Sequence, residues 1–293
     1  MDKFSGIWVS HSSLTDFRRC PRSYYLKNIY KDPRSGHKIA LTSPALALGM
    51  AVHEVLESLS TIPVKDRFTI SLIDRFKTVW PKYSGNKGGF DSIDSEQSYR
   101  TRGEEMLGRV DTHRGPLERL AVKIKMDLPN YWLSEEDGLI LCGKLDWLEY
   151  LPAGSGEGEE DAVHIIDFKT GKRDEDPESL QLPIYFLLAH NCQTRKVEKA
   201  SYWYIARDEL LTPMPLPSLD TSHELVLKAA KEVKLARSLE RFKCPGGDAG
   251  CKYCTPLEKV LQGQAEFVGS DNYDRDVYSL AAVHDTSPAS EIL

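Results

Sequence analysis

The sequence lacks any run of about 18 consecutive apolar residues, the length that a membrane-spanning helix requires. Its first residues, MDKFSGIWVSHSS, lack the basic and then apolar layout of a secretory signal. It also has no internal repeat and no interdomain linker. We therefore expect no membrane association, a cytoplasmic location, and one domain over residues 10–268 of the 293.

The sequence has no excess of positive charge, since its formal net charge is -6. This argues against a protein that coats nucleic acid indiscriminately. Seven bases against one acid nevertheless gather in residues 18–38. This strip suits attachment to phosphates, with Arg18, Arg19 and Arg22 as DNA contacts, although a solvated helix face explains it equally well. Residues 269–293 are acidic and are expected to form a flexible tail.

The strip also contains three tyrosines, Tyr24, Tyr25 and Tyr30. Aromatic side chains beside basic ones can stack on the bases of a single strand. Buried packing is at least as good an explanation for them, so both interpretations stay open.

Six cysteines in a chain without an export signal are expected to bind metal or to do chemistry rather than to form disulfides. Three of them form C-x6-C-x2-C in a Gly- and Pro-rich segment: Cys244, Cys251 and Cys254. A closed site needs a fourth thiolate, and Cys20 is the candidate because it precedes Pro21 at an expected helix break. Cys142 and Cys192 are expected to be core residues.

One remote cysteine plus a trio is unlike the local ligand pairs of most closed zinc sites. Four thiolates suit a 4Fe-4S cluster, with zinc as the main competing metal. Such a centre would join the N- and C-terminal segments of the chain.

Hydrophobic periodicity predicts an α/β fold in which helices come first and strands follow. A capping box at Ser13 and Asp16 begins the first helix, and Pro21 ends it. Further helices are predicted at residues 21–30, 44–60, 66–80, 96–119, 177–191 with a kink at Pro183, and 223–242. Strands are predicted at 121–128, 139–150 and 163–169, as an antiparallel meander, and at 199–206.

Two aspartates meet if the strands at 139–150 and 163–169 pair with Tyr150 opposite Val163, because Asp146 then lies opposite Asp167. Like charges so close would destabilise the sheet unless a divalent cation lies between them, and oxygen ligands suit Mg²⁺ or Mn²⁺. Lys169 is two residues from Asp167 and so shares its face.

His53 and Glu57 are four residues apart on one face of an expected helix. His53 could complete the metal site, and Glu57 could act as an auxiliary acid behind the ligands. Taken alone, a histidine on a helix usually satisfies only a hydrogen bond, and D-x-K at a strand end is common by chance.

The ordered set GMAVHEVLE, GKLDWLE, IIDFKTGK and QLPIY resembles the RecB-like branch of the PD-(D/E)XK nucleases, which includes CRISPR-associated adaptation nucleases and AddB-type repair nucleases. The resemblance implies a restriction-endonuclease-like mixed sheet flanked by helices. It also implies roles for particular residues: metal ligands His53, Asp146, Asp167 and the backbone carbonyl of Phe168, the catalytic Lys169, and the Q-x-x-x-Y pair Gln181 and Tyr185 near the DNA.

The cysteine arrangement resembles that of the iron-sulfur subset of these nucleases. In those relatives C-x2-C commonly precedes the longer gap, whereas here the longer gap comes first, which leaves the cluster type open.

We therefore expect a Mg²⁺- or Mn²⁺-dependent deoxyribonuclease, with exonuclease favoured over endonuclease activity, acting on single strands or DNA ends in CRISPR spacer acquisition or DNA repair. Integrase or helicase-nuclease subunits would be separate chains. The alternatives are a non-catalytic DNA-binding scaffold subunit of such a complex and a zinc-stapled binding module unrelated to nucleases.

Overall fold

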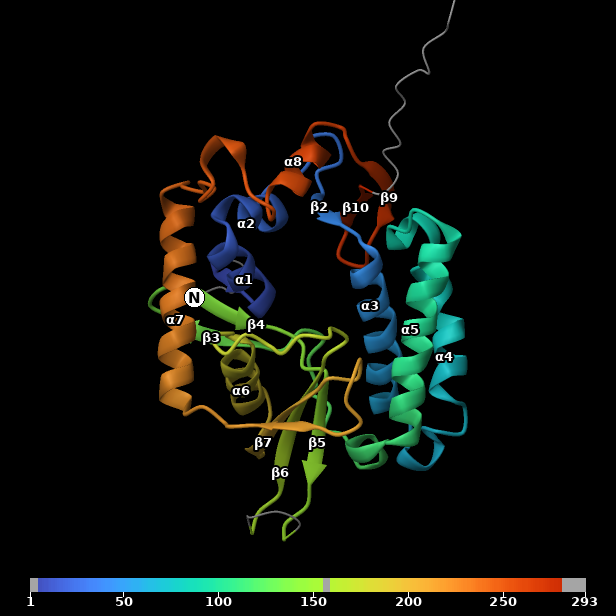
Figure 1. The fold of residues 1–293 in the computed structure, drawn as a ribbon. Coiled ribbons are helices and arrows are strands. Elements are labelled where there is room, and N and C mark those ends of the chain that lie inside the picture. Colours follow the sequence, from blue (N-terminus) through green and yellow to red (C-terminus); the bar gives the residue numbers. More distant parts are fainter. Residues whose placement is uncertain (1–4, 155–158, 281–293) are drawn as a thin grey trace, which may run out of the picture.

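Groups of helices and groups of strands follow one another in the computed structural model, which describes residues 5–154 and 159–280 (Figure 1). The helices are α1 (His11–Arg19), α2 (Pro21–Asn28), α3 (Pro44–Ser58), α4 (Leu72–Val79), α5 (Ile93–Thr112), α6 (Gln181–Cys192), α7 (Leu219–Ser238) and α8 (Thr255–Leu261). The strands are β1 (Ile7–Val9), β2 (Lys38–Leu41), β3 (Asn130–Ser134), β4 (Leu139–Cys142), β5 (Trp147–Leu151), β6 (Ala162–Phe168), β7 (Lys196–Trp203), β8 (Thr212–Met214), β9 (Glu266–Ser270) and β10 (Arg275–Ser279). None of these described helices is long and apolar enough to cross a membrane.

The strands form small sheets rather than one large one. The sheet β5-β6-β7-β8 is mixed, because β6 pairs antiparallel with β5 and parallel with β7. Within the described ranges, β1-β4-β3 and β2-β10-β9 form two further sheets, each with one parallel and one antiparallel pair. The predicted α/β class with mixed pairing is confirmed, whereas the expectation of a single sheet is wrong.

The predicted long strand at 139–150 is broken after Cys142 and resumes at Trp147. Its halves, β4 and β5, belong to different sheets, so the predicted meander is also wrong. The amide of Gly143 donates to the carbonyl of Pro129 at 3.1 Å, and the chain turns there before β5 begins. The turn leaves Asp146 directly before the first residue of β5.

The predicted strand at 121–128 is absent from the described structure, apart from one isolated bridge between Ala121 and Glu149. Its alternation reflects partial burial of Val122 and Ile124 against the core, with no continuous partner strand. The strand that pairs with β4 follows it instead, as β3.

Several helix starts differ from the prediction by a few residues, and two of them, those of α1 and α6, bear on how the chain is capped. The capping box of α1 is formed by Ser10 and Ser13 rather than by Ser13 and Asp16. Helix α6 begins at Gln181, since Asp176 accepts hydrogen bonds from the following amides in a turn of its own. Pro183 therefore lies in the first helical turn, where amide donors have no partner within the helix and proline is tolerated.

The predicted flexible tail is wrong for residues 269–280. Strands β9 and β10 pair antiparallel, and β10 also pairs in parallel with β2, so that Arg275 lies opposite Lys38. Tyr278 on β10 is buried with Leu26 and Ile39. The acidic composition concealed these two short strands, while residues 281–293 lie outside the described ranges.

The β5–β8 sheet has an apolar core on each face, which is why all of β6 is buried. Ile166 and Phe168 pack with α3, α4 and α5, while Val163 and Ile165 pack with α6. Figure 1 shows α3–α5 grouped together and α6 on the other side of this sheet. The sheet is thereby fixed from both faces at the strand ends that bear the candidate site.

Helix α5 approaches its neighbours most closely at Gly103, where an added Cβ would lie 2.4 Å from Cζ of Phe76 and 3.0 Å from Cδ1 of Leu48. Gly103→Ala should therefore lower the free energy of unfolding by about 1–3 kcal/mol through overpacking, despite the gain in helix propensity. Urea unfolding followed by circular dichroism measures the change.

Gly108→Ala is the matched control on the same helix, since its new Cβ would meet only Cδ1 of Ile73 at an ordinary 3.6 Å. It should raise stability by up to about 1 kcal/mol. Equal stabilisation by both alanines would contradict close packing at Gly103.

Candidate functional site

The candidate site lies where β5 begins and β6 ends. The predicted register is confirmed, because Tyr150 pairs with Val163 and Trp147 pairs with Ile166. Asp146 and Asp167 are the next residues beyond that last pair. The amide of Phe168 donates to Oδ2 of Asp146 at 2.9 Å, which ties the Asp146 carboxylate to the end of β6.

Helix α3 brings an imidazole and a carboxylate to Asp146. Nδ1 of His53 lies 3.5 Å from Oδ2 of Asp146 and 3.5 Å from Oε1 of Glu57. The three side chains each offer a ligand atom within 4.8 Å of the others, which is a spacing that one metal ion could bridge. Burial opposes charge on His53, but the two carboxylates raise its pKa well above 6.5. Glu57 thus lies beside His53 and Asp146 rather than behind them.

Asp167 is almost fully buried and points toward Lys169 and Gln181. Nζ of Lys169 lies 2.8 Å from its Oδ2, and Nε2 of Gln181 donates to its Oδ1 at 2.8 Å. Burial, followed by the charge of Asp146, raises the pKa of Asp167 to about 7. The negative charges of Asp146 and Asp167 repel each other when both groups are ionised. A bound cation would offset this repulsion, so the pair suits a cation site.

Lys169 is held between acids. Its Nζ forms ion pairs of 2.8 Å with both Asp167 and Glu175, donates to Oε1 of Gln181, and lies 4.7 Å from the centre of the Tyr202 ring. Sequence reasoning missed Glu175, because it is one acid among several in the segment RDEDPES and no spacing distinguishes it.

The Q-x-x-x-Y pair is buried rather than open to solvent. Nε2 of Gln181 donates to the hydroxyl of Tyr185 at 3.2 Å as well as to Asp167. Burial, and then the charge of Asp146, raises the pKa of Tyr185 well above 10, so the phenol stays neutral. The pair therefore supports the acid–lysine arrangement, while its expected position near DNA and the role of the Phe168 carbonyl stay predictions.

The arginines of the basic strip have different partners. Nη1 of Arg18 donates to the carbonyl of Glu178 at 3.2 Å, just before α6. Arg19 lies over the ring of Tyr253, and Arg22 forms a 2.5 Å ion pair with Glu258 of α8. Arg19 and Arg22 thus contact the C-terminal cysteine segment, and their DNA contacts stay predictions.

The tyrosines of the strip are explained by packing. Tyr24 is buried between the rings of Phe17 and Phe242. Tyr25 and Tyr30 are partly buried against the cysteine cluster.

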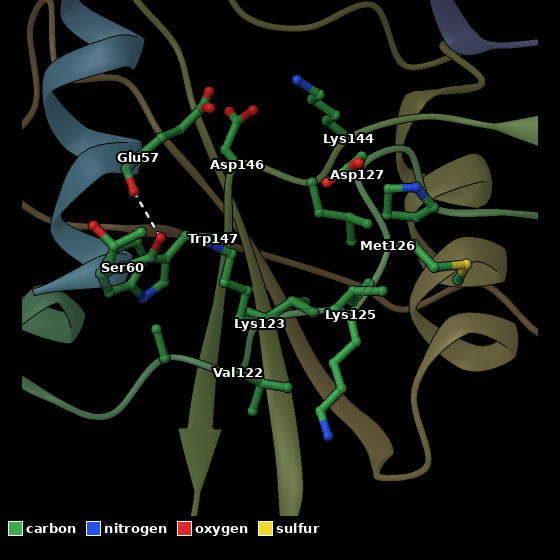
Figure 2. A pocket seen from close by; sticks show the side chains of 16 residues that line it. Glu57, Ser60, Val122, Lys123, Lys125, Met126, Asp127, Lys144, Asp146 and Trp147 are labelled. Atoms are coloured by element: carbon green, nitrogen blue, oxygen red, sulfur yellow. Dashed lines mark hydrogen bonds between the residues drawn. The ribbon is translucent and has the colours of Figure 1, made fainter.

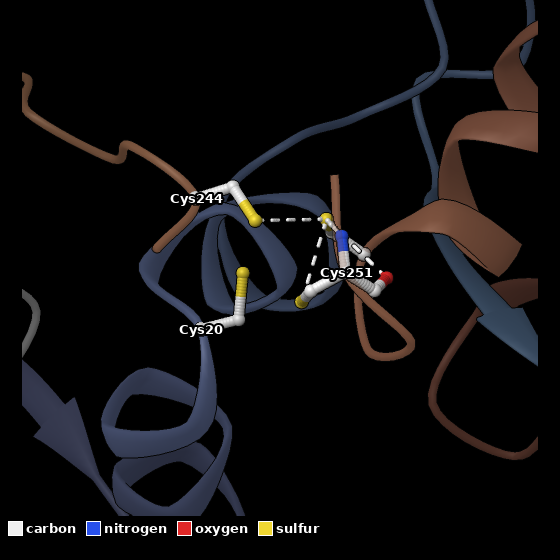
Figure 3. Close-up of side chains that lie close together, drawn as sticks. Cys20, Cys244 and Cys251 are labelled. Carbon is white, nitrogen blue, oxygen red and sulfur yellow. Dashed lines mark hydrogen bonds between the residues drawn. The ribbon is translucent and has the colours of Figure 1, made fainter. Parts of the chain in front are cut away.

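The four predicted cysteines meet between α1, α2 and α8 (Figure 3). Their sulfurs all lie within 4.8 Å of one another, and none forms a disulfide. Sγ of Cys254 lies 3.6 Å from that of Cys244 and 3.8 Å from that of Cys251. Cys142 and Cys192 lie elsewhere, as expected: Cys142 is buried, and Cys192 packs partly buried against the core.

The loop that carries the trio requires glycine twice. A Cβ on Gly246 would lie 2.3 Å from the carbonyl oxygen of Gly250, and Gly250 itself has a φ of +72°. Backbone amides donate to three of the sulfurs: Ser23 to Cys20, Gly246 to Cys244, and Cys251 to Cys254. Amide donors stabilise thiolates, so the donor set fits a metal centre.

The distances between the sulfurs indicate which kind of metal centre the four cysteines could hold. One tetrahedral ion with metal–sulfur bonds of about 2.3 Å separates its sulfurs by about 3.8 Å. The observed distances match such a site, and a four-iron cluster, which binds each thiolate to a different iron, would need the sulfurs to spread apart.

Comparison with known proteins agrees with this geometry. The family model described as the PD-(D/E)XK nuclease superfamily matches residues 8–256 of the chain. No curated protein matches it significantly.

Removal of one cysteine ligand should empty the cysteine centre. In Cys20→Ala we expect iron and zinc per chain to fall close to zero and the midpoint of thermal unfolding to fall by at least about 5 °C, because metal binding contributes to folding. Elemental analysis of anaerobically purified protein measures the first quantity and calorimetry the second. Cys142→Ala is the matched control, since Cys142 is also buried but lies outside the centre. Metal retained by Cys20→Ala would contradict its role as a ligand.

Proposed function

Because the chain belongs to the PD-(D/E)XK nuclease superfamily, we propose that it is a metal-dependent nuclease that hydrolyses phosphodiester bonds of DNA. The observation that carries the proposal is the convergence of Asp146, Asp167 and Lys169 at the joined ends of β5 and β6. The two carboxylates are nearly enclosed by protein, and a cation bound between them would offset the repulsion of two like charges side by side.

We propose that His53, Asp146, Asp167 and the Phe168 carbonyl hold Mg²⁺ or Mn²⁺, with Glu57 alongside. When bound, the cation would acidify the attacking water and neutralise charge on the phosphate. Lys169 would stabilise the negative charge that develops on the phosphate oxygens. Its ion pairs with Asp167 and Glu175 keep the ammonium charged and fixed beside that position.

The cysteine centre is proposed to hold a 4Fe-4S cluster with a structural role. The layout of one N-terminal cysteine and a C-terminal trio supports iron and sulfur, whereas the close sulfur spacing suits zinc. Either metal would fasten α1 and α2 to the segment that leads into α8. Colour and elemental analysis of the purified protein distinguish the two.

The substrate is proposed to be single-stranded DNA or DNA ends, and exonuclease activity is favoured. The ordered motifs around His53, Asp146, Asp167 and Gln181 support this through their resemblance to RecB-like nucleases. CRISPR spacer acquisition and DNA repair are the proposed settings, with integrase or helicase-nuclease subunits as separate partner chains.

Cleavage of end-labelled single- and double-stranded DNA tests the proposal. With Mn²⁺ or Mg²⁺ we expect cleavage that EDTA abolishes and that Asp167→Ala and Lys169→Ala each reduce by at least about 100-fold, because each removes a group that acts on the developing charge. The product ladder then gives the polarity.

Lys196→Ala is the control for Lys169→Ala, since Lys196 is exposed at the far end of the same sheet, opposite Ala162. It should cut at the wild-type rate. Folded protein that binds DNA but never cuts it, with any of these metals, would favour the scaffold alternative instead.

A further inference from the structure

A cavity of about 720 Å³ opens directly beside the proposed metal site (Figure 2). Asp146 and Glu57 belong both to its lining and to the group that could hold a cation. Lys169 and Asp167 do not line it. The cavity therefore borders the Asp146 and Glu57 side of the proposed metal position rather than the Lys169 side.

One wall of the cavity is the segment 121–129, which is anchored at both ends to the strands that flank Asp146. The amide of Val122 donates to the carbonyl of Leu148 at 2.7 Å, and the amide of Gly143 donates to the carbonyl of Pro129 at 3.1 Å. The wall is thus fixed relative to the metal site without belonging to a sheet.

Three lysines line the cavity: Lys123, Lys125 and Lys144. All three are exposed, and none of them forms an ion pair with another described residue. Lys231 and Lys234, by contrast, both form ion pairs with Asp137. Glu57 and Asp146 are assigned to the cation. The remaining charged residues of the lining are these three lysines and one acid, Asp127, so their net charge is +2. Figure 2 shows Lys144 pointing toward the end with the Asp146 and Glu57 carboxylates, and Lys125 pointing the other way.

Tyr273 adds an aromatic ring next to Lys144. It is 65% exposed, more than any other aromatic side chain that the structure describes, and Nζ of Lys144 lies 5.9 Å from the centre of its ring. The backbone of the β9–β10 turn that carries Tyr273 is ordered by Oδ1 of Asp271, which accepts hydrogen bonds from the amides of Tyr273 and Arg275, and the Arg275 guanidinium lies 5.4 Å from the centre of the ring. An exposed, held aromatic beside bases is the arrangement on which an unpaired nucleobase stacks.

We propose that this cavity binds an unpaired DNA strand beside the metal site, with the three lysines on its phosphates and Tyr273 stacked on one of its bases. The inference rests on the proposed nuclease function and names its substrate as single-stranded DNA.

The shape and lining favour one strand over a duplex. A volume of about 720 Å³ falls in the range of roughly 300–1,000 Å³ that accommodates one small organic molecule, enough for a short stretch of one strand. Apolar side chains such as Val122, Met126 and Leu145 also line it, and they could contact base faces only where the bases are not stacked inside a helix.

Fluorescence anisotropy of a short labelled oligothymidine tests the inference, with Ca²⁺ as the cation and a gel to verify that the oligonucleotide stays intact. The triple variant Lys123→Ala/Lys125→Ala/Lys144→Ala should raise Kd at least about tenfold. It should also lower the slope of log Kd against log salt by about 2, since each contact with a single strand contributes about 0.7.

The matched control removes the same charge elsewhere. Lys196→Ala/Lys199→Ala/Lys228→Ala replaces exposed lysines on β7 and α7, and it should leave Kd within about twofold of wild type. Tyr273→Ala should raise Kd about tenfold, whereas Tyr273→Phe should bind like wild type, because stacking needs the ring and not the hydroxyl.

Three outcomes would overturn the inference: wild-type protein that does not bind the oligonucleotide, a cavity variant that binds as tightly as the control, or an unlabelled duplex that competes as well as the single strand. Cleavage by wild type, measured separately, keeps the two proposals apart. If wild type cuts DNA but the triple lysine variant binds the oligonucleotide as tightly as its control, only the cavity proposal fails. If the oligonucleotide binds through the cavity but wild type does not cut DNA, only the nuclease proposal fails.

Discussion

Two carboxylates buried side by side govern how the rest of the molecule is arranged. Asp146 and Asp167 come together because β5 and β6 pair in one register, and apolar side chains from α3–α6 exclude water around them. Each charge is then met by a neighbour: His53 for Asp146, and Lys169 with Gln181 for Asp167. The elements that supply these neighbours have little freedom, since a displaced partner would leave a buried charge uncompensated.

The sequence predicted the site better than the fold around it. The spacing of Asp167 and Lys169, the four-residue spacing of His53 and Glu57, and the hairpin register depend only on local periodicity, and the structure brings these residues together. The pairing of β4 and β5 with different sheets depends on a turn at Gly143 and on a hydrogen bond to Pro129, which no local pattern encodes. Glu175 was missed for the same reason, because its contact with Lys169 arises from loop geometry alone.

Composition was misleading at the C-terminal end. An excess of acids predicted a flexible tail, yet Asp271 is used to hold a turn and Asp276 pairs with His37 across the sheet. The four cysteines that were predicted to meet do lie together, because ligand chemistry and a helix break at Cys20 left few alternatives, whereas the identity of a metal depends on distances that spacing in sequence does not fix.

The pairing of β2 with β10 sets an order of events as the chain leaves the ribosome. Synthesis proceeds from the N-terminus, so the residues of the acid–lysine site, which lie between α3 and α6, are made before the C-terminal strands. Within the described ranges, strand β2 has no neighbouring strand until residues 275–278 are synthesised. Cys20 likewise has no cysteine partners until Cys244, Cys251 and Cys254 are synthesised. The acid–lysine residues can therefore come together before the four cysteines do, and closure of the cysteine group is a late step of folding.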